Sequence, residues 1–224
     1  MKKIFILVFI SLLFSNIQAQ EKTFQSPNYD VIKKEIQDRS SIYYYPSLMQ
    51  RFENYDSTLA LEDYRHLYYG FVFQKNYEPY WRFSEDEELL EYYRKKEIKE
   101  KDYKSIIRLV NKSLEEFPFE LNYLNFMCHI YKLKGDEAMV NKISKRLNGI
   151  IQVITSSGDG KTCETGFHVI SVSHEYLLLN YFELTMKSQA LVERKCDYLS
   201  LEENKAKIKG LYFNVEKLFG MDIK

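Results

Sequence analysis

The stretch GIIQVITSSGDGKTCETGFHVISV, residues 149–172, decides the fold, because the pattern of apolar residues changes within it. A short run rich in β-branched residues, 149–155, is followed by the glycine turn Gly158-Asp159-Gly160 and by a second such run, 166–172. Two runs of this kind joined by a glycine-containing connection are typical of a β-hairpin. We therefore predict that strands begin at residue 149 and that the preceding chain is built differently.

Three further candidate strands follow, at 176–182, 190–199 and 208–215. Apolar and charged residues alternate in 190–199, which is typical of a sheet with one buried face and one solvated face. The run 176–182 is apolar throughout and fits a helix equally well. The short connections between the runs predict antiparallel pairing.

Residues 20–148 have helical periodicity instead. All four prolines occur by Pro118, and seven of the eight glycines occur from Gly135 onward, which suits helix starts early and turns late. Ser84 and Glu87 have the spacing of a capping box. Apolar residues recur at helical spacing in segments 30–38, 47–52, 61–73, 84–93, 102–117, 121–133 and 136–147. The prediction is an α+β fold, with a helical array over 20–148 followed by a β-rich region, 149–224, that forms an antiparallel sheet.

Residues 102–147 partly resemble a tetratricopeptide-type helix pair. Pro118 would close one helix, Tyr131 lies in the next, and Gly135-Asp136 would form the turn. Larger residues occupy several positions where that family prefers small ones, and no strict repeat covers the earlier helices. The resemblance implies a helix-hairpin array that presents a surface to a partner.

The N-terminus has the pattern of a secretory signal peptide. Lys2 and Lys3 precede an apolar run, 4–14, and a short polar stretch that ends at Ala19. We expect residues 1–19 to be removed and the mature chain to start at Gln20, in the periplasm or outside the cell. The apolar run is too short for a retained membrane anchor, so no stable membrane span is expected after cleavage.

Charge and cysteine content limit the possible functions. The chain has 32 basic and 32 acidic residues, and loss of the two N-terminal lysines leaves 30 and 32, a net charge of −2. This balance disfavours binding to nucleic acid or to an anionic membrane. Three cysteines are too few for a disulfide scaffold, but Cys163 and Cys196 are a possible pair in an exported chain, while Cys128 fits a helix core.

Six segments spread over the mature chain carry a family resemblance: Tyr43–Pro46, Glu62–Gly70, Ser156–Thr165, His168–Tyr176, Lys195–Tyr198 and Gly210–Val215. These segments resemble a family of exported Bacteroidetes proteins catalogued as a domain of unknown function, number 4919. The resemblance implies no activity, ligand or catalytic residue.

The polar loop 156–165 is the most site-like segment of the sequence. Its Gly160-Lys161-Thr162 ending is similar to a phosphate-binding loop, but Thr155 stands where that motif requires glycine, and a strand is expected where it requires a helix. A glycine-containing turn is therefore the favoured interpretation. Its candidate ligand-binding residues are Ser156, Ser157, Asp159 and Lys161.

His168 and His174 complete this group of candidates. On one straight strand they would lie about 20 Å apart, too far to share a metal ion, so no metal site and no cofactor is expected. Only a turn between them would bring them together.

The leading hypothesis is a non-catalytic module that binds a protein or peptide partner in the bacterial envelope. The alternative is a small-ligand-binding protein or hydrolase that uses the 156–165 loop and the two histidines. A third possibility is a glycan platform formed by exposed Tyr43, Tyr44, Tyr45 and Trp81, since aromatic rings stack on sugars.

Overall fold

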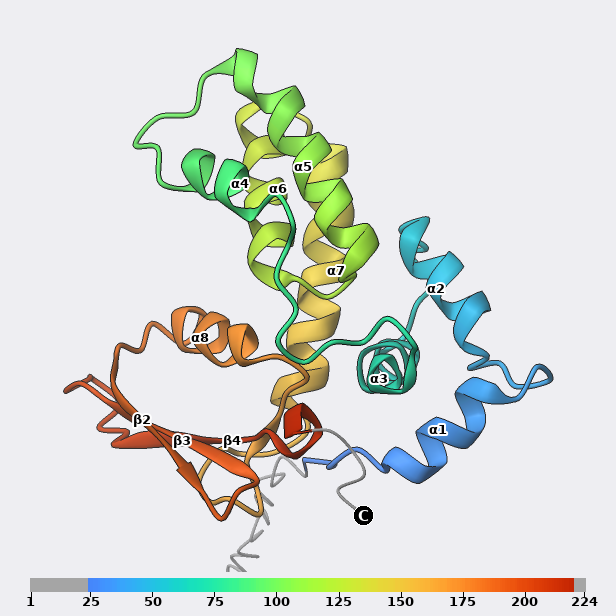
Figure 1. Cartoon of the computed structure of the whole chain (residues 1–224), viewed down its shortest axis with the longest axis vertical. Coiled ribbons are helices and arrows are strands. Elements are labelled where there is room, and N and C mark those ends of the chain that lie inside the picture. The colour runs from blue at the N-terminus through green and yellow to red at the C-terminus, as the bar shows by residue number, and fades with distance from the viewer. Residues whose placement is uncertain (1–23, 220–224) are drawn as a thin grey trace, which may run out of the picture.

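The computed structural model describes residues 24–219. The predicted signal peptide, residues 1–19, lies outside this range. Within these residues, seven α-helices precede strand β1, which is followed by an eighth helix and by the other three strands of a four-stranded mixed sheet (Figure 1). The predicted α+β class, with helices first, is confirmed. No helix within 24–219 is both long and apolar enough to cross a membrane.

The first three helices pack around α3. The side chain of Asn28 accepts a hydrogen bond from the amide of Val31 and so caps α1, and Pro46 lies in the first turn of α2, where its missing N–H costs nothing. Residues 64–70 of α3 are all buried, because α1, α2 and α7 pack around this helix. The bounds are α1 Tyr29–Gln37, α2 Tyr45–Glu53, α3 Leu61–Gly70 and the 3₁₀-helix η1 Phe71–Phe73.

The next four helices form an upper stack in which α5 packs on α6 and α6 packs on α7 (Figure 1). Pro118 separates α5 from α6, and Gly135, with a φ of 72°, allows the turn into α7. Helix α4 starts at Asp86 without a side-chain cap, so the predicted capping box at Ser84 does not form. The bounds are α4 Asp86–Tyr93, η2 Glu100–Asp102, α5 Tyr103–Glu116, α6 Leu121–Leu133 and α7 Glu137–Thr155.

The C-terminal sheet has the strand order β1-β4-β3-β2, and α8 lies over one of its faces (Figure 1). Strands β2, β3 and β4 pair antiparallel as predicted, whereas β1 pairs with β4 in parallel. The parallel pair arises because β1 is followed by α8, and not by a tight turn. The bounds are β1 Phe167–His168, α8 Val172–Tyr181, β2 Met186–Val192, β3 Cys196–Leu201, β4 Gly210–Asn214 and η3 Glu216–Phe219.

The predicted first strand, 149–155, is wrong, because these residues form the last two turns of α7. The buried positions, 150, 151, 153 and 154, lie on one face of the helix, but the run is short and its β-branched residues are equally typical of a strand. Gly149 does not end the helix: a Cβ there would lie 2.7 Å from the ring of Tyr64, so glycine permits close packing of α7 on α3.

Two other predicted strands are also corrected. The run 176–182 belongs to α8, which is the helical alternative for an apolar run. The run 190–199 is divided between β2 and β3 by a tight turn, in which Glu193 and Arg194 have φ values of 53° and 56°. Two successive positive φ values are those of a type I′ hairpin turn. The expected strand 208–215 is confirmed as β4.

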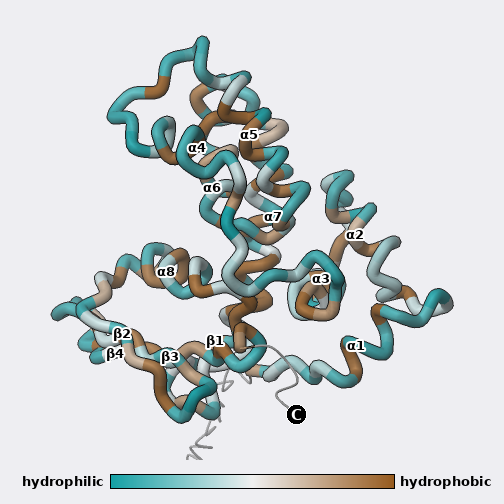
Figure 2. Tube along the Cα trace, in the orientation of Figure 1, coloured by the Kyte–Doolittle hydropathy of each residue, from teal (hydrophilic) through white to brown (hydrophobic). Residues whose placement is uncertain are grey.

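Buried side chains form two clusters. One joins α1–α3 to the lower half of α7, to α8 and to the sheet, and the other lies among α4, α5, α6 and the upper half of α7. Figure 2 shows hydrophobic residues along α7 where it passes between α3 and the sheet. Trp81 and Leu147 pack against both clusters, so Trp81 marks the junction between them.

Candidate functional site

The 156–165 loop connects α7 to β1, and its polar groups bond mainly within the loop. Asp159 accepts hydrogen bonds from the amide of Lys161 (3.1 Å) and the hydroxyl of Thr165 (2.6 Å) and pairs with the Lys161 ammonium at 3.1 Å. A Cβ on Gly158 would lie 2.3 Å from the carbonyl oxygen of Thr165, so glycine is needed where the loop closes on itself. A helix precedes the loop and a strand follows it, the reverse of a phosphate-binding loop.

Ser156 and Ser157 end α7 and connect it to neighbouring segments. The Ser157 hydroxyl is buried, donates to the carbonyl of Ile154 (2.6 Å) and accepts from the amide of His168 (2.8 Å). The Ser156 hydroxyl donates to the carbonyl of Val153 (3.0 Å) and accepts from the guanidinium of Arg65 (3.3 Å). Both side chains therefore act as structural links between α7, α3 and β1.

His174 lies at the centre of a buried hydrogen-bond chain. Its Nε2 is 2.8 Å from the carbonyl oxygen of Phe119, so this nitrogen carries the proton, and Nδ1 accepts from the hydroxyl of Tyr68 at 2.7 Å. The Tyr68 hydroxyl in turn accepts from the amide of Ile170 at 3.3 Å. Burial lowers the pKa of His174 to about 4, which keeps the ring neutral at physiological pH.

His168 lies in different surroundings. Its ring is near those of Tyr29 and Tyr69, with centroid separations of 6.1 and 6.4 Å, and its Nδ1 is buried without a hydrogen-bond partner. Burial, and then the charges of Arg65 and Lys217, lower the pKa of His168 to about 4. The two histidines thus contact different tyrosines, Tyr69 and Tyr68, whose rings pack against each other at 5.1 Å, and no group of three His, Cys, Asp or Glu residues within 24–219 could hold a metal ion.

Cys163 and Cys196 form a disulfide, with Cα atoms 5.7 Å apart. It ties the 156–165 loop to the first residue of β3. Cys128 is a free cysteine, half-buried between α6 and α7.

The aromatic residues of the third hypothesis, a glycan platform, do not form one exposed surface and instead pack within the fold. Tyr45 is buried, and the ring of Tyr43 is stacked on that of His66 with centroids 3.8 Å apart. Trp81 lies at the junction of the two clusters, where its ring stacks on Phe117 at 5.3 Å.

Trp81 lines a pocket of about 340 Å³ beside α4 and the start of α6. We call it the aromatic–acid pocket because aromatic rings and two carboxylates share its lining. The lining residues are Trp81, Arg82, Phe83, Asp86, Leu90, Tyr93, Glu120, Asn122 and Tyr123.

The local structure explains how the two carboxylates reach the pocket. Asp86 lies in the first turn of α4, and Glu120 is the N-cap of α6, so both occupy helix N-termini, where a negative charge is stabilised. The Tyr123 hydroxyl donates to Asp86. Glu120 accepts from the backbone and side-chain amides of Asn122, both at 3.1 Å, and from the Ser173 hydroxyl at 3.5 Å.

The electrostatics of the pocket follow from burial and from these neighbours. Burial raises the pKa of Glu120 and the charge of Asp86 raises it further, against the hydrogen bonds from Asn122 and Ser173, which lower it. Burial and the bond to Asp86 raise the pKa of Tyr123, which remains a neutral donor. The pocket therefore holds two interacting carboxylates, one of which is partly desolvated.

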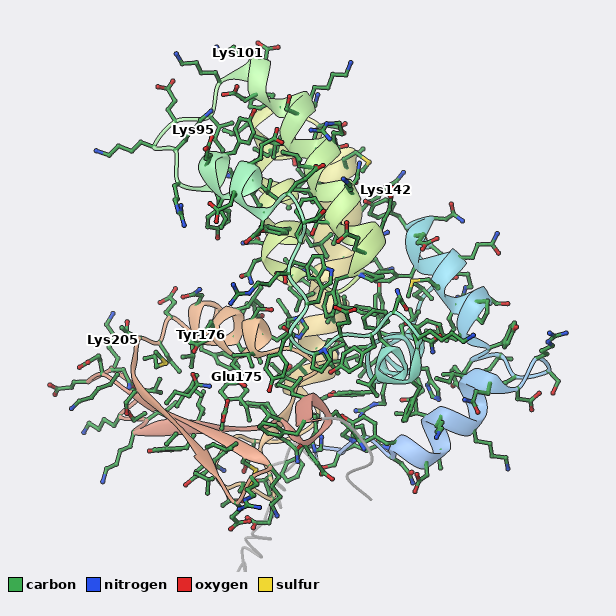
Figure 3. The ribbon with its side chains drawn as sticks, in the orientation of Figure 1. Lys95, Lys101, Lys142, Glu175, Tyr176 and Lys205 are labelled. Atoms are coloured by element: carbon green, nitrogen blue, oxygen red, sulfur yellow. A yellow bond between two sulfur atoms is a disulfide. The ribbon has the colours of Figure 1, made fainter. Side chains whose placement is uncertain are left out.

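A second acidic pair lies between α8 and the sheet. Glu175 points from α8 toward the strands (Figure 3), and the amide of Gln189 donates to Asp197 at 2.5 Å and to Glu175 at 3.4 Å. Burial, and then the charge of Asp197 and a hydrogen bond to it, raise the pKa of Glu175 to about 9. Glu175 is therefore a neutral acid at pH 7, and its Oε1 is buried without a hydrogen-bond partner among the described residues.

Sequence reasoning missed the carboxylates of the pocket. It selected Trp81 as an aromatic surface residue but gave no role to Asp86 or Glu120, which are far apart in the chain and look like ordinary helix-terminal acids. The break between α5 and α6 at Phe117-Pro118 was the signal for part of the site, because it places Glu120 at a helix start, but nothing in the sequence placed this residue beside Trp81.

Comparison with known proteins gives one match. The sequence model of a domain of unknown function, DUF4919, matches residues 30–223, a range that includes the whole aromatic–acid pocket. No curated protein and no solved structure matches the chain.

Proposed function

The chain belongs to the DUF4919 family, a domain of unknown function, and we propose that it is an exported, non-catalytic module that binds a peptide segment of a partner protein. The observation that carries this proposal is the aromatic–acid pocket, a concave site with aromatic walls and a few converging polar groups. Pockets of this composition are the usual form of binding sites.

Helices around the pocket support a partner-binding role. Helices α4–α7 are arranged as a stack of neighbouring helices, and we propose that this stack works as a tetratricopeptide-like array in which the pocket is the recognition point. Tyr93 at the pocket is 49 % exposed, and Tyr80, next to Trp81 in the chain, is 66 % exposed. These rings are available to residues that flank an inserted side chain.

The alternative, a ligand site or hydrolase built on the 156–165 loop and the histidines, has less support. Asp159, Ser157 and His174 use their polar atoms in bonds that hold the fold together. His168 and His174 contact different tyrosine rings, and no hydrogen bond within residues 24–219 joins the two imidazoles, so they do not form a shared acid–base pair.

Export is part of the proposal and is supported by the Cys163–Cys196 disulfide, since such bonds persist in oxidising compartments. The exported protein should begin at Gln20, which N-terminal sequencing of material from the envelope or the medium would show. A chain that retains Met1 in the cytoplasm would contradict this part of the proposal.

A peptide-display selection tests recognition directly. We expect a random peptide library, selected on residues 20–224, to yield a consensus that Tyr93→Ala no longer retains, because this ring forms part of the pocket wall. Tyr181→Ala is the matched control, since Tyr181 is an exposed tyrosine on α8 outside the pocket lining. A selection that yields no consensus, or one retained equally by Tyr93→Ala, would refute peptide recognition at this pocket.

A further inference from the structure

Building on this proposed peptide recognition, we propose that the aromatic–acid pocket is specific for a cationic side chain, a lysine or arginine of the partner segment, which Asp86 and Glu120 receive between aromatic walls. The bound cation would supply the positively charged partner that residues 24–219 do not provide to these two carboxylates.

The groups that already bond the two carboxylates are neutral. Asp86 receives the hydroxyl of Tyr123, and Glu120 receives the amides of Asn122 and the hydroxyl of Ser173. Within residues 24–219, no lysine, arginine or histidine forms an ion pair with either carboxylate. Among the described residues, these carboxylates are therefore hydrogen-bonded by neutral groups, and Arg82, although it lines the pocket, does not pair with either of them.

The repulsion between the carboxylates favours a cationic ligand over a neutral one. Asp86 is close enough to Glu120 to act on its ionisation, and the burial of Glu120 strengthens this interaction. An ammonium or guanidinium group would neutralise that repulsion and form charge-assisted hydrogen bonds. A sugar hydroxyl would form hydrogen bonds but would leave the repulsion in place.

The walls of the pocket suit the rest of such a side chain. Trp81, Phe83 and Tyr93 offer apolar ring surface to an aliphatic stem and ring faces to a cation. The volume of about 340 Å³ lies at the lower end of the range for ligand pockets, about 300–1,000 Å³. A single long side chain matches this size better than an extended ligand does.

The positive charge of Arg82 offers a second way to test whether the pocket prefers a cationic ligand. It is the basic residue of the pocket lining, and its side chain is exposed. Its charge opposes an incoming cation, so its removal should strengthen binding. A purely apolar pocket would not respond in this way.

The test is a calorimetric titration of the mature chain with three five-residue peptides, in which glycines flank a central lysine, acetyl-lysine or glutamate. Trp81, the single tryptophan of the chain, reports the same binding by fluorescence. We expect the lysine peptide to bind about tenfold or more tightly than the acetyl-lysine peptide, as is typical for loss of a charge-assisted bond.

Asp86→Asn should weaken lysine binding to a similar extent, and Arg82→Gln should strengthen it several-fold. The matched control, Glu91→Gln, removes a charge from α4 outside the pocket lining and should change little.

The outcomes separate this inference from the proposed function. Equal binding of the lysine and acetyl-lysine peptides, tighter binding of the glutamate peptide, or no binding of the lysine peptide would overturn the cation specificity. A display consensus that depends on Tyr93 but lacks lysine and arginine would also overturn it, while leaving peptide recognition in place. Circular dichroism of each variant shows whether its fold is intact.

Discussion

Glu175 shows how a single buried side chain sets the pH dependence of stability. Its carboxyl group titrates near pH 4.5 in the unfolded chain, but at about 9 in the folded one, because of burial and of Asp197. The folded state therefore binds more protons at Glu175 between these values, and the contribution of this group to stability falls as the pH rises through the interval. His168 and His174, whose folded pKa values are about 4, act in the opposite direction only up to their usual pKa near 6.5, so the decline due to Glu175 is expected between about pH 6.5 and 9.

We expect Glu175→Gln to raise the free energy of unfolding at pH 8 by a few kcal/mol. The amide stays uncharged at every pH and so removes the free-energy cost of keeping a proton on the buried carboxyl group above its usual pKa. Urea unfolding at pH 6, 7 and 8 measures the effect, and the variant should lose most of the decline seen in the wild type. Glu203→Gln, an exposed position, is the control. A variant that is less stable than the wild type at pH 8 would show that Glu175 is ionised in the fold.

At the scale of single residues, the sequence pointed to side chains that are important for the fold, but it did not predict their structural roles. Ser157 and His174 were selected as ligand-binding candidates, and both are buried structural donors or acceptors. Their partners could not be foreseen, because Tyr68 and His174 are separated by 106 positions in the chain. Asp86 and Glu120 were missed for the same reason: their interaction exists only after α4 and α6 have packed.

At the scale of elements, the Cys163–Cys196 disulfide is the main covalent constraint on the C-terminal sheet. It closes a segment of 33 residues that includes β1, α8 and β2. Cross-linking a segment of this length restricts the unfolded chain and typically stabilises the fold by about 2–4 kcal/mol.

We expect the double variant Cys163→Ser with Cys196→Ser to lose about 2–4 kcal/mol of unfolding free energy. Urea unfolding with and without a reductant provides the measurement. The reductant should lower the midpoint of the wild type and leave that of the double variant unchanged. Cys128→Ser, which keeps the disulfide, is the control. An unchanged wild-type midpoint under reduction would contradict a stabilising role.

Elements were predictable where a periodic pattern was long and bounded by a stop signal. Helix α5 ends next to Pro118 and α6 ends near Gly135, and both were located from such signals. Residues 149–155 were misassigned, because a short run of β-branched residues fits a strand as well as a helix and because Gly149 resembles a breaker while serving α7–α3 packing. The hairpin turn at Glu193-Arg194 was missed because neither residue is the usual glycine or asparagine.

At the scale of the whole molecule, the chain does not divide where the composition changes. The lower cluster combines side chains of α1–α3 with side chains from residues 150–218. The upper cluster contains only buried residues from 83–143. Helix α7 contributes to both, so residue 148 lies inside a shared element.

A fragment of residues 149–224 is therefore expected not to fold by itself. It would expose its own apolar face that α1–α3 cover, which includes Ile150, Val153 and Ile154, all fully buried in the whole chain. Circular dichroism and urea unfolding should show no cooperative transition for the fragment, while the chain 20–224 shows one. A fragment with a cooperative transition and dispersed amide resonances would contradict the shared core.

The aromatic–acid pocket lies where these two clusters meet, and its role in recognition is the central claim about the molecule. The most direct measurement is an amide NMR titration of the mature chain with the five-residue lysine peptide. We predict shift changes concentrated on residues 81–93 and 120–123, with the acetyl-lysine peptide causing much smaller ones. Shifts confined to the 156–165 loop and His168, or the absence of any shift, would contradict the claim.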